Sequence, residues 1–353
     1  GVQTCALPIC ARARRDFFSL SPCRSATYVS LLIQSIQMND GRSIPQIGLG
    51  SVLKSGEDTQ RIVEYAIKTG YRHLDLAKAY KNQRDVGAAL KKVIPAKISR
   101  EELFITSKVW NNMHSPEDVE RSLNDTLEEL GVDYLDLFLM HWPVAFDAPM
   151  NDFRIEENGW VKLDFQHSVV DTWKAMIAMQ KTGKVKSIGV SNFSPSAIEQ
   201  ITKYTGVAPA VNQIEAHPLL PQDDLVEWHK KNNVHITAYS PLGNNLTGQK
   251  RLTEFPQVIE IAERRKVDPA QVLIAWGVHR GYSVIPKSVT PSRIVSNFEQ
   301  IEISDDEYKA VCKIMNDNGG HVRYNTPITY DPPWDINVFG EEVEKKATHQ
   351  LVI

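Results

Sequence analysis

Four polar residues stand at or just past the ends of short apolar runs in the first half of the chain. They are Asp75, Tyr80, Lys108 and His141. A free phenol has a pKa of about 10, so Tyr80 is a reluctant acid at neutral pH unless a cation such as Lys108 favours its phenolate. Asp75 would pair with Lys108 and fix its position, and a neutral His141 imidazole can hydrogen-bond a substrate oxygen and share the proton relay. Together these residue types predict an enzyme with Tyr80 as its proton donor.

Each of these four residues also has an ordinary structural explanation. An aspartate after a strand often caps a helix, a tyrosine near a helix start often packs, and a lysine or histidine at a strand end is often surface. Their occurrence together in one spacing pattern favours a catalytic role over these structural explanations, because an α/β barrel carries its active site where its strands end.

The elements that position these residues alternate along the chain from residue 38 onward, as expected of βαβ units and a parallel sheet. Strands are expected near 47–50, 72–75, 104–109, 135–140, 185–190, 210–215, 235–239 and 282–285. Helices are expected near 57–69, 83–94, 116–130, 168–182, 195–204, 222–232, 255–280 (broken near Pro269) and 291–297. Eight pairs without a linker predict one α/β domain, a closed (β/α)8 TIM barrel with its active site at the C-terminal ends of the strands.

A doubly wound sheet is the alternative architecture. That fold usually places a Gly-x-Gly-x-x-Gly turn after its first strand. Here Gly48-Leu49-Gly50 lacks the third glycine. The barrel is therefore the preferred interpretation.

The chain is expected to divide into a leader (1–37), a barrel domain (38–318) and a C-terminal loop and tail (319–353). The leader has one acidic residue among four arginines. It is expected to be non-native or disordered, with a native start at Met38, and an organelle transit peptide is the alternative. Trp334 and Phe339 make the tail too aromatic for a simple solvated terminus, so they either line the pocket or pack the tail onto the outside.

Composition narrows the choice of partners. The net charge of -3 offers no basic stripe for nucleic acid, and no apolar run approaches the roughly 18 residues that span a bilayer. Neither nucleic acid nor a membrane is an expected partner, and no metal site is expected. Cys5, Cys10 and Cys23 lie in the leader, which leaves only Cys312 in the folded body. A single thiol suits a reducing compartment and predicts a cytoplasmic protein.

Three separate motifs reveal a family resemblance. They are Gly-Tyr-Arg-His-Leu-Asp-Leu-Ala (70–77) followed by Tyr80, Gln83 and Gly87; Ser-Lys-Val-Trp (107–110) with His-Trp-Pro (141–143); and Ile-Pro-Lys-Ser-Val-Thr-Pro-Ser-Arg (285–293). From about residue 43 to 317 the chain resembles the aldo-keto reductase superfamily, and within it fungal NADPH-dependent reductases of aldehydes and sugars. The resemblance implies that Tyr80 is the acid in carbonyl reduction, assisted by Asp75, Lys108 and His141. It also implies that Trp110 and His141 bind the substrate.

The resemblance further implies NADPH as the cofactor. Ser191, Asn192 and Gln213 would hold the nicotinamide carboxamide, and Tyr239 would stack on the nicotinamide ring. The pyrophosphate would lie under Ser240, Leu242 and the loop that follows. A basic cluster at a helix start would bind the 2′-phosphate and favour NADPH over NADH. This cluster consists of Lys287, Ser288 and Arg293, and Asn297 follows it beside the adenine.

Some positions depart from the family pattern and leave the substrate open. Ser296 stands where a glutamate often contacts the adenine, and Ser51-Val52 replaces a common Thr-aromatic pair. The predicted function is reduction of small aldehydes, aldoses or other carbonyls by a monomer or weak dimer. The alternative is a nicotinamide-binding regulatory or accessory subunit with little turnover. The complete set of four catalytic residues favours the enzyme.

Overall fold

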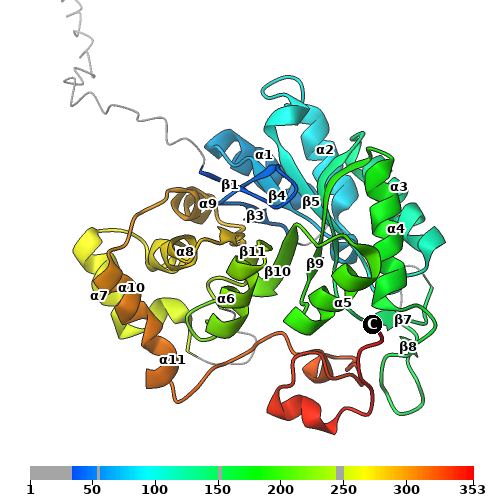
Figure 1. The fold of residues 1–353 in the computed structure, drawn as a ribbon. Coiled ribbons are helices and arrows are strands. Elements are labelled where there is room, and N and C mark those ends of the chain that lie inside the picture. Colours follow the sequence, from blue (N-terminus) through cyan, green and yellow to red (C-terminus); the bar gives the residue numbers. More distant parts are fainter. Residues whose placement is uncertain (1–33, 54–55, 150–152, 244–249) are drawn as a thin grey trace, which may run out of the picture. The chain divides into compact units, whose positions relative to one another are not determined.

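The computed structural model describes residues 34–53, 56–149, 153–243 and 250–353. At its centre eight parallel strands follow one another in chain order around a rolled sheet, with helices outside (Figure 1). The first and last strands meet, because Ile47 forms a parallel bridge to Val284 and the Gly48 backbone N–H donates to the Val284 carbonyl at 3.0 Å. This closure confirms the predicted (β/α)8 barrel.

All eight predicted parallel strands are present, although the first and last are short. They are β3 (Leu49–Gly50), β4 (His73–Asp75), β5 (Phe104–Val109), β6 (Leu135–Met140), β9 (Val185–Ser191), β10 (Val211–Glu215), β11 (His235–Tyr239) and β12 (Ser283–Val284).

The predicted helices are also present. They are α1 (Glu57–Thr69), α2 (Gln83–Val93), α3 (Pro116–Leu130), α4 (Val169–Lys181), α5 (Pro195–Thr205), α6 (Asp223–Lys231), α7 (Pro256–Arg265), α8 (Pro269–His279) and α9 (Pro291–Phe298), followed by α10 (Asp305–Cys312) and α11 (Ile314–Asp317). The expected break near Pro269 separates α7 from α8, where Lys266 adopts φ 58° and Asp268 caps α8. Ser115 and Ser194 cap α3 and α5 by accepting hydrogen bonds from backbone N–H groups.

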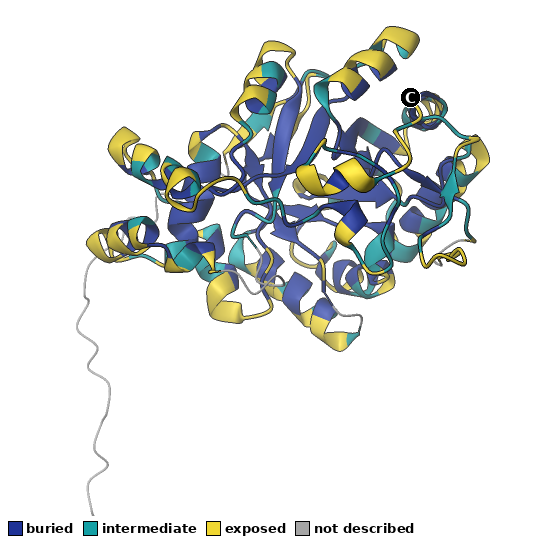
Figure 2. Cartoon of the chain, turned by 90° about the horizontal axis from the view of Figure 1, so that it is seen from below, coloured by how far each residue is buried: buried dark blue, intermediate teal, exposed yellow. Residues whose placement is uncertain are grey.

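Side chains alternate along each strand between the barrel interior and the helix layer. On β6, Phe138 and Met140 belong to the large core packed against the helices, whereas Leu137 and Leu139 belong to a separate cluster inside the barrel. By the same alternation, Ile105, Ser107 and Val109 of β5 face the helices, where Ser107 Oγ donates to Gln83 of α2 at 2.6 Å, so Thr106 and Lys108 face inward. Figure 2 shows the buried strands at the centre and exposed residues on the outer faces of the helices.

A hairpin of β1 (Ser35–Gln37) and β2 (Ser43–Pro45) closes the N-terminal end of the barrel. Met38 and Ile44 pack in one cluster with Phe104 and Ala210, which stand at the starts of β5 and β10. The opposite, C-terminal end stays open for a site. The leader predicted for residues 1–37 overlaps this hairpin, because β1 begins at Ser35. Residues 1–33 lie outside the described residues.

The C-terminal tail folds back over the open end of the barrel. Trp334, which is 3% exposed, packs with Trp142 and Phe146 in an aromatic cluster that also includes Trp110. Near it, β7 (Ala145–Phe146) and β8 (Leu163–Asp164) form a second small hairpin. Three short 3₁₀ turns also shape the rim and the tail. They are η3 (Leu252–Glu254), η4 (Pro327–Thr329) and η5 (Glu342–Lys346).

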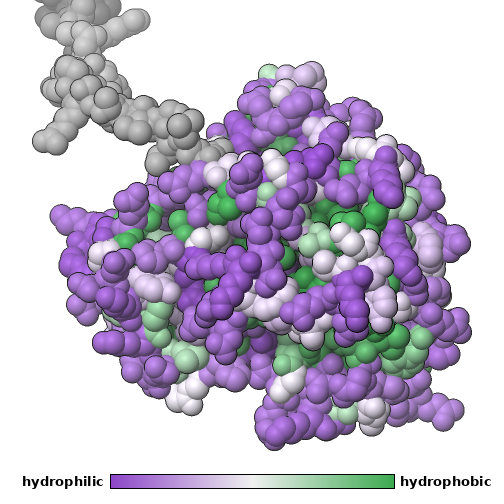
Figure 3. Space-filling view, viewed as in Figure 1, coloured by the Kyte–Doolittle hydropathy of each residue, from purple (hydrophilic) through white to green (hydrophobic). Residues whose placement is uncertain are grey.

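The face drawn in Figure 3 is mostly hydrophilic, with apolar residues visible mainly in recesses. Among the described helices, none combines the length and the apolar character that crossing a bilayer requires.

Candidate active site

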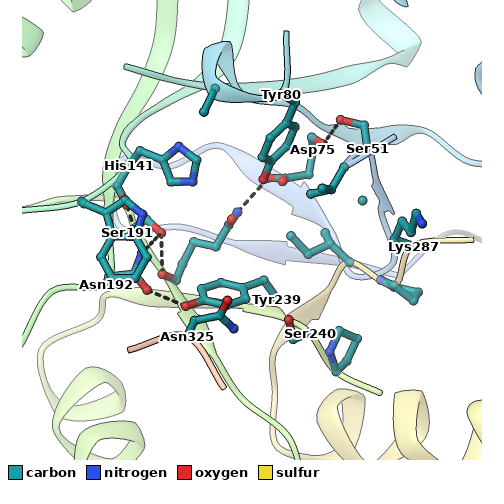
Figure 4. A pocket seen from close by; sticks show the side chains of 18 of the residues that line it. Ser51, Asp75, Tyr80, His141, Ser191, Asn192, Tyr239, Ser240, Lys287 and Asn325 are labelled. Atoms are coloured by element: carbon teal, nitrogen blue, oxygen red, sulfur yellow. Dashed lines mark hydrogen bonds between the residues drawn. The ribbon is translucent and has the colours of Figure 1, made fainter. Parts of the chain in front are cut away.

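A cavity of about 540 Å³ opens at the C-terminal ends of the strands, where the sequence placed the site (Figure 4). It gathers residues that lie far apart along the chain. Of the predicted site residues, its wall contains Asp75, Tyr80, Trp110, His141, Ser191, Asn192, Gln213, Tyr239, Ser240, Leu242 and Lys287. Lys108 lies behind this wall, bonded to Asp75.

The Lys108–Asp75 pair forms the buried base of the site. Lys108 Nζ donates to Asp75 Oδ1 at 2.6 Å and to the Leu76 carbonyl at 2.7 Å. Both side chains are almost fully buried, at 0% and 2% exposure. Two partners therefore fix the ammonium group, which lies 5.2 Å from the centre of the Tyr80 ring.

Tyr80 reaches the cavity from the short 3₁₀ turn η1 (Lys78–Tyr80), which follows β4. Lys78 is only 5% exposed and pairs with Glu129 of α3 at 2.9 Å, so the turn is tied to the helix layer. This tether was not predicted, because a lysine beside a predicted site gives no sequence signal for pairing with a distant helix.

Burial and charge oppose each other at Tyr80. Burial raises the pKa of Tyr80, the Lys108 ammonium lowers it, and the net pKa lies above the usual value. The predicted direction of the lysine effect is correct, but desolvation outweighs it because the phenol lies deep in the site. Burial would lower the pKa of Lys108, yet the charge of Asp75 and the nearby Tyr80 raise it overall, so Lys108 stays an ammonium.

His141 presents a neutral imidazole beside Tyr80. Burial and then the charge of Lys108 hold the pKa of His141 well below its usual value. Its ring lies edge-on to Trp110 and Tyr80, with centroids 5.0 and 6.0 Å apart. These two rings pack against the imidazole, and His141 Nδ1 forms no hydrogen bond with a described residue. A neutral ring carries one N–H and can donate it to a substrate oxygen.

Three side chains at the ends of β9 and β11, those of Ser191, Asn192 and Tyr239, form a connected polar group that is also bonded to the backbone of β10. Tyr239 donates its O–H to Asn192 Oδ1 at 2.7 Å, and Asn192 Nδ2 donates to Ser191 Oγ at 3.1 Å and to the His141 carbonyl at 3.0 Å. Ser191 Oγ donates to the Gln213 carbonyl at 2.9 Å. These contacts fix amide and hydroxyl groups at the cavity wall, where a carboxamide could be held between them.

The predicted phosphate-binding cluster lies at the start of α9. Lys287 lines the cavity and Arg293 is exposed on the helix, and neither side chain forms an ion pair or hydrogen bond with a described residue. Ser288 Oγ accepts from the Thr290 backbone N–H at 3.2 Å, and Asn297 is buried. Two unpaired cations at a helix start fit a phosphate group, as NADPH requires. Ser288, Arg293 and Asn297 lie outside the cavity wall.

Sequence reasoning missed the residues that the tail brings to the site. Asn325 and Tyr330 line the cavity, whereas Trp334 and Phe339 pack on Trp142 next to it. The tail therefore lines the pocket, but it does so through Asn325 and Tyr330. Trp334 and Phe339, the two residues considered in the sequence, pack the tail onto Trp142 instead. No periodic pattern marks a loop residue of this kind in the sequence.

Glu215 of β10 was also missed, although it holds the tail in place. Its carboxylate accepts hydrogen bonds from the backbone N–H groups of Tyr324 and Asn325 and from Asn325 Nδ2, each at 2.9 Å, and from His217 at 2.9 Å. Its side chain is 0% exposed. A signal was available, because Glu215 stands two residues after Gln213 and so shares its inward face.

Fold and site together define a class of protein. A closed parallel barrel carries at its open end a phenol, a buried Lys–Asp pair, a neutral imidazole and a cavity lined by Lys287, with Arg293 on the adjoining helix, both cations without an ionic partner among the described residues. This arrangement is that of a nicotinamide-dependent oxidoreductase acting on carbonyl groups. The chain belongs to the Aldo/keto reductase family, whose profile matches residues 46–316.

Individual relatives agree with this assignment. A D/L-glyceraldehyde reductase of Hypocrea jecorina is 46% identical over 331 residues, covering 91% of this chain and 98% of the relative. Aldo-keto reductase family 1 member A1 of Rattus norvegicus is 40% identical over 326 residues, covering 90% and 97%. The solved aldose reductase of Schistosoma japonicum is 38% identical with a TM-score of 0.78, covering 88% of this chain and 99% of that one.

The family assignment confirms three predictions. The chain is an oxidoreductase, it uses NADPH, and it reduces carbonyl groups of the aldehyde type. The alternative of a regulatory subunit with little turnover finds no support. The roles of individual residues stay predictions.

Proposed function

We propose that this protein reduces small polar aldehydes to alcohols, with glyceraldehyde as the first substrate to test. The observation that carries the proposal is the buried Lys108–Asp75 pair beneath Tyr80, which equips a phenol to give up a proton. The cavity wall adds aromatic groups, Trp110 and Tyr330, and an amide, Asn325. Such a mixture suits a small substrate with hydroxyl groups. The similarity to a D/L-glyceraldehyde reductase supports the same substrate class.

In this proposal Tyr80 donates the proton to the carbonyl oxygen, and the Lys108 ammonium stabilises the phenolate that forms. Asp75 keeps Lys108 charged and in place. His141 donates its single N–H to the same oxygen and orients the substrate, while Trp110 shields the site from water. NADPH, when bound, supplies the hydride for the carbonyl carbon.

The proposed cofactor contacts follow the polar groups along the cavity. Ser191, Asn192 and Gln213 hold the carboxamide, and Tyr239 stacks on the nicotinamide ring. The rest of the cofactor is held by Ser240 and Leu242 at the pyrophosphate, by Lys287, Ser288 and Arg293 at the 2′-phosphate, and by Asn297 at the adenine. We also propose that the protein acts as a monomer or weak dimer in the cytoplasm, which the single cysteine of its described body, Cys312, suits.

The test measures the loss of NADPH absorbance with the purified chain and a panel of glyceraldehyde, xylose, an aromatic aldehyde and a simple ketone. We expect NADPH-dependent turnover with the highest kcat/KM for glyceraldehyde. A higher kcat/KM for the aromatic aldehyde would reject the substrate class. An inactive protein that still binds NADPH would overturn the whole proposal.

A further inference from the structure

The carboxylate of Asp75 is shared between two groups that have different tasks. Its Oδ1 accepts from Lys108 Nζ at 2.6 Å, and its Oδ2 accepts from Gln213 Nε2 at 2.7 Å. Asp75 and Gln213 are both buried. One aspartate thus joins the lysine beneath the proton donor to an amide in the cavity wall, although Asp75 and Gln213 lie on strands on opposite sides of the barrel interior.

This contact decides which way the Gln213 amide points. An ionised carboxylate only accepts hydrogen bonds, so the NH₂ group must face Asp75. Gln213 Oε1 is then turned away from Asp75, and it forms no hydrogen bond with a described residue, although Gln213 lines the cavity. An acceptor held in this way suits the N–H of a carboxamide. Without Asp75 the amide could rotate and present a donor instead.

We propose that Gln213 is a positioning residue that links cofactor binding to proton donation: Asp75 orients its amide toward the nicotinamide carboxamide, and the amide in turn moderates the charge of Asp75 beneath Tyr80. The inference rests on the proposed role of Tyr80 as the acid. A hydrogen bond to Asp75 Oδ2 withdraws negative charge from the carboxylate. Losing it leaves a more strongly negative Asp75 near the phenol, which makes Tyr80 a weaker acid.

Other charged and titratable groups face the same region and stay unchanged in the test. They are Lys108 on β5, His141 after β6, Glu215 on β10, Tyr239 on β11 and His73 on β4. Of these, Lys108 is the cation that lowers the pKa of Tyr80, and its ammonium is held by Asp75 Oδ1 and the Leu76 carbonyl, not by Gln213.

The deciding experiment is a double-mutant cycle on NADPH binding, read from the quenching of protein fluorescence. Gln213→Met and Asp75→Asn are made singly and together. We expect each single variant to weaken binding roughly tenfold, the scale of one lost hydrogen bond. Asp75→Asn should add almost nothing in the Gln213→Met background, because the amide it orients is absent. Equal effects of Asp75→Asn in both backgrounds would overturn the proposal.

Ser191→Ala provides the matched control. Ser191 belongs to the same polar group, but its hydroxyl is hydrogen-bonded to the Gln213 carbonyl and to Asn192, not to Asp75. Its loss should weaken NADPH binding additively with Asp75→Asn. Non-additivity of the same size would show that any loss in the polar group has this effect, and would also overturn the proposal.

If Asp75→Asn does not fold, a second measurement tests whether Gln213 affects the acidity of Tyr80. The pH profile of kcat/KM for reduction falls at high pH as the proton donor ionises. In Gln213→Met this alkaline limb should move up by roughly one pH unit, whereas in Ser191→Ala it should stay in place. An unmoved limb in Gln213→Met would overturn the link. Turnover retained in Tyr80→Phe would instead reject Tyr80 as the acid, and the binding cycle would still test the orientation of Gln213.

Discussion

At the scale of single residues, the site holds its acid in an environment that favours the neutral phenol. Burial raises the pKa of Tyr80 more than Lys108 lowers it. Carbonyl reduction needs the phenol of Tyr80 to be protonated at the start, and its raised pKa keeps it protonated at neutral pH. The buried ammonium then stabilises the phenolate as it forms, where a low local dielectric strengthens the attraction.

The first prediction concerns Tyr80 itself. Tyr80→Phe removes the proton and keeps the ring that packs beside His141. We expect kcat for aldehyde reduction to fall by roughly 10²–10⁴-fold, the usual contribution of a general acid. NADPH binding, measured by fluorescence quenching, should change little. Unchanged turnover would remove Tyr80 from its proposed role.

The second prediction concerns the choice between NADPH and NADH. Lys287 lines the cavity and has no anionic partner among the described residues. Lys287→Ala should raise KM for NADPH by roughly tenfold or more, as expected for a lost charged hydrogen bond, and leave KM for NADH nearly unchanged. Lys313→Ala, at the junction of α10 and α11, serves as a control for the loss of one positive charge. Equal effects on the two cofactors would reject the 2′-phosphate contact.

At the scale of elements, the alternation of strands and helices was predictable because each has its own apolar period. The boundaries of β5 and β6 agree with the expected ranges. The hairpin of β1 and β2 and the placement of the tail were not predictable. They depend on contacts with distant strands, such as Ile44 with Phe104 and Tyr324 with Glu215, which leave no local period.

The third prediction tests how the tail is held. In Glu215→Gln the amide can no longer accept all of the hydrogen bonds from Tyr324, Asn325 and His217. Each buried donor left unpaired costs about 1–3 kcal/mol. Hydrogen exchange at residues 322–330 should therefore accelerate, and KM for the aldehyde should rise more than kcat falls.

Glu341→Gln is the matched control for the tail, because Glu341 pairs with His321 and Arg323 nearer the surface. The His321 side chain is 54% exposed, and an exposed ion pair contributes about 0–1 kcal/mol. The same exchange rates in both variants would show that Glu215 does not anchor the tail.

The fourth prediction concerns the contact between α2 and α3. In an exposed helix, replacing glycine by alanine is favourable by about 1 kcal/mol. At Gly87, however, an added Cβ would lie 2.2 Å from the Glu129 carbonyl oxygen, and backbone cannot move aside cheaply. We expect Gly87→Ala to destabilise the protein by about 1–3 kcal/mol in urea unfolding. Lys91→Ala, on the exposed face of α2, should be nearly neutral, and a stabilised Gly87→Ala would contradict the close contact.

At the scale of the whole molecule, stability should depend on pH through buried histidines. Burial lowers the pKa of His73 and His114 to about 4 and that of His235 to about 3. In the unfolded chain these groups titrate at about 6.5, so below that pH the unfolded state binds protons that the native state excludes.

The fifth prediction follows from this difference in proton binding. As the pH falls from 7 to 5, each of the three histidines should remove about 2 kcal/mol from the free energy of unfolding. Carboxylates with lowered pKa values, such as Glu215, lose their contribution only near and below their ordinary pKa, outside this window. Urea unfolding at the two pH values provides the measurement. Equal stability at pH 7 and pH 5 would show that the histidines are protonated in the native state.

The two ends of the described chain lie at different ends of the barrel. The hairpin of β1 and β2 closes the base, whereas the Val352 carbonyl accepts from the Val169 N–H beside the small β7–β8 hairpin near the mouth. For attaching the enzyme to a solid support, a tether ahead of β1 therefore leaves the mouth facing the solution. A tether at the C-terminus would crowd the entrance through which aldehyde and cofactor pass.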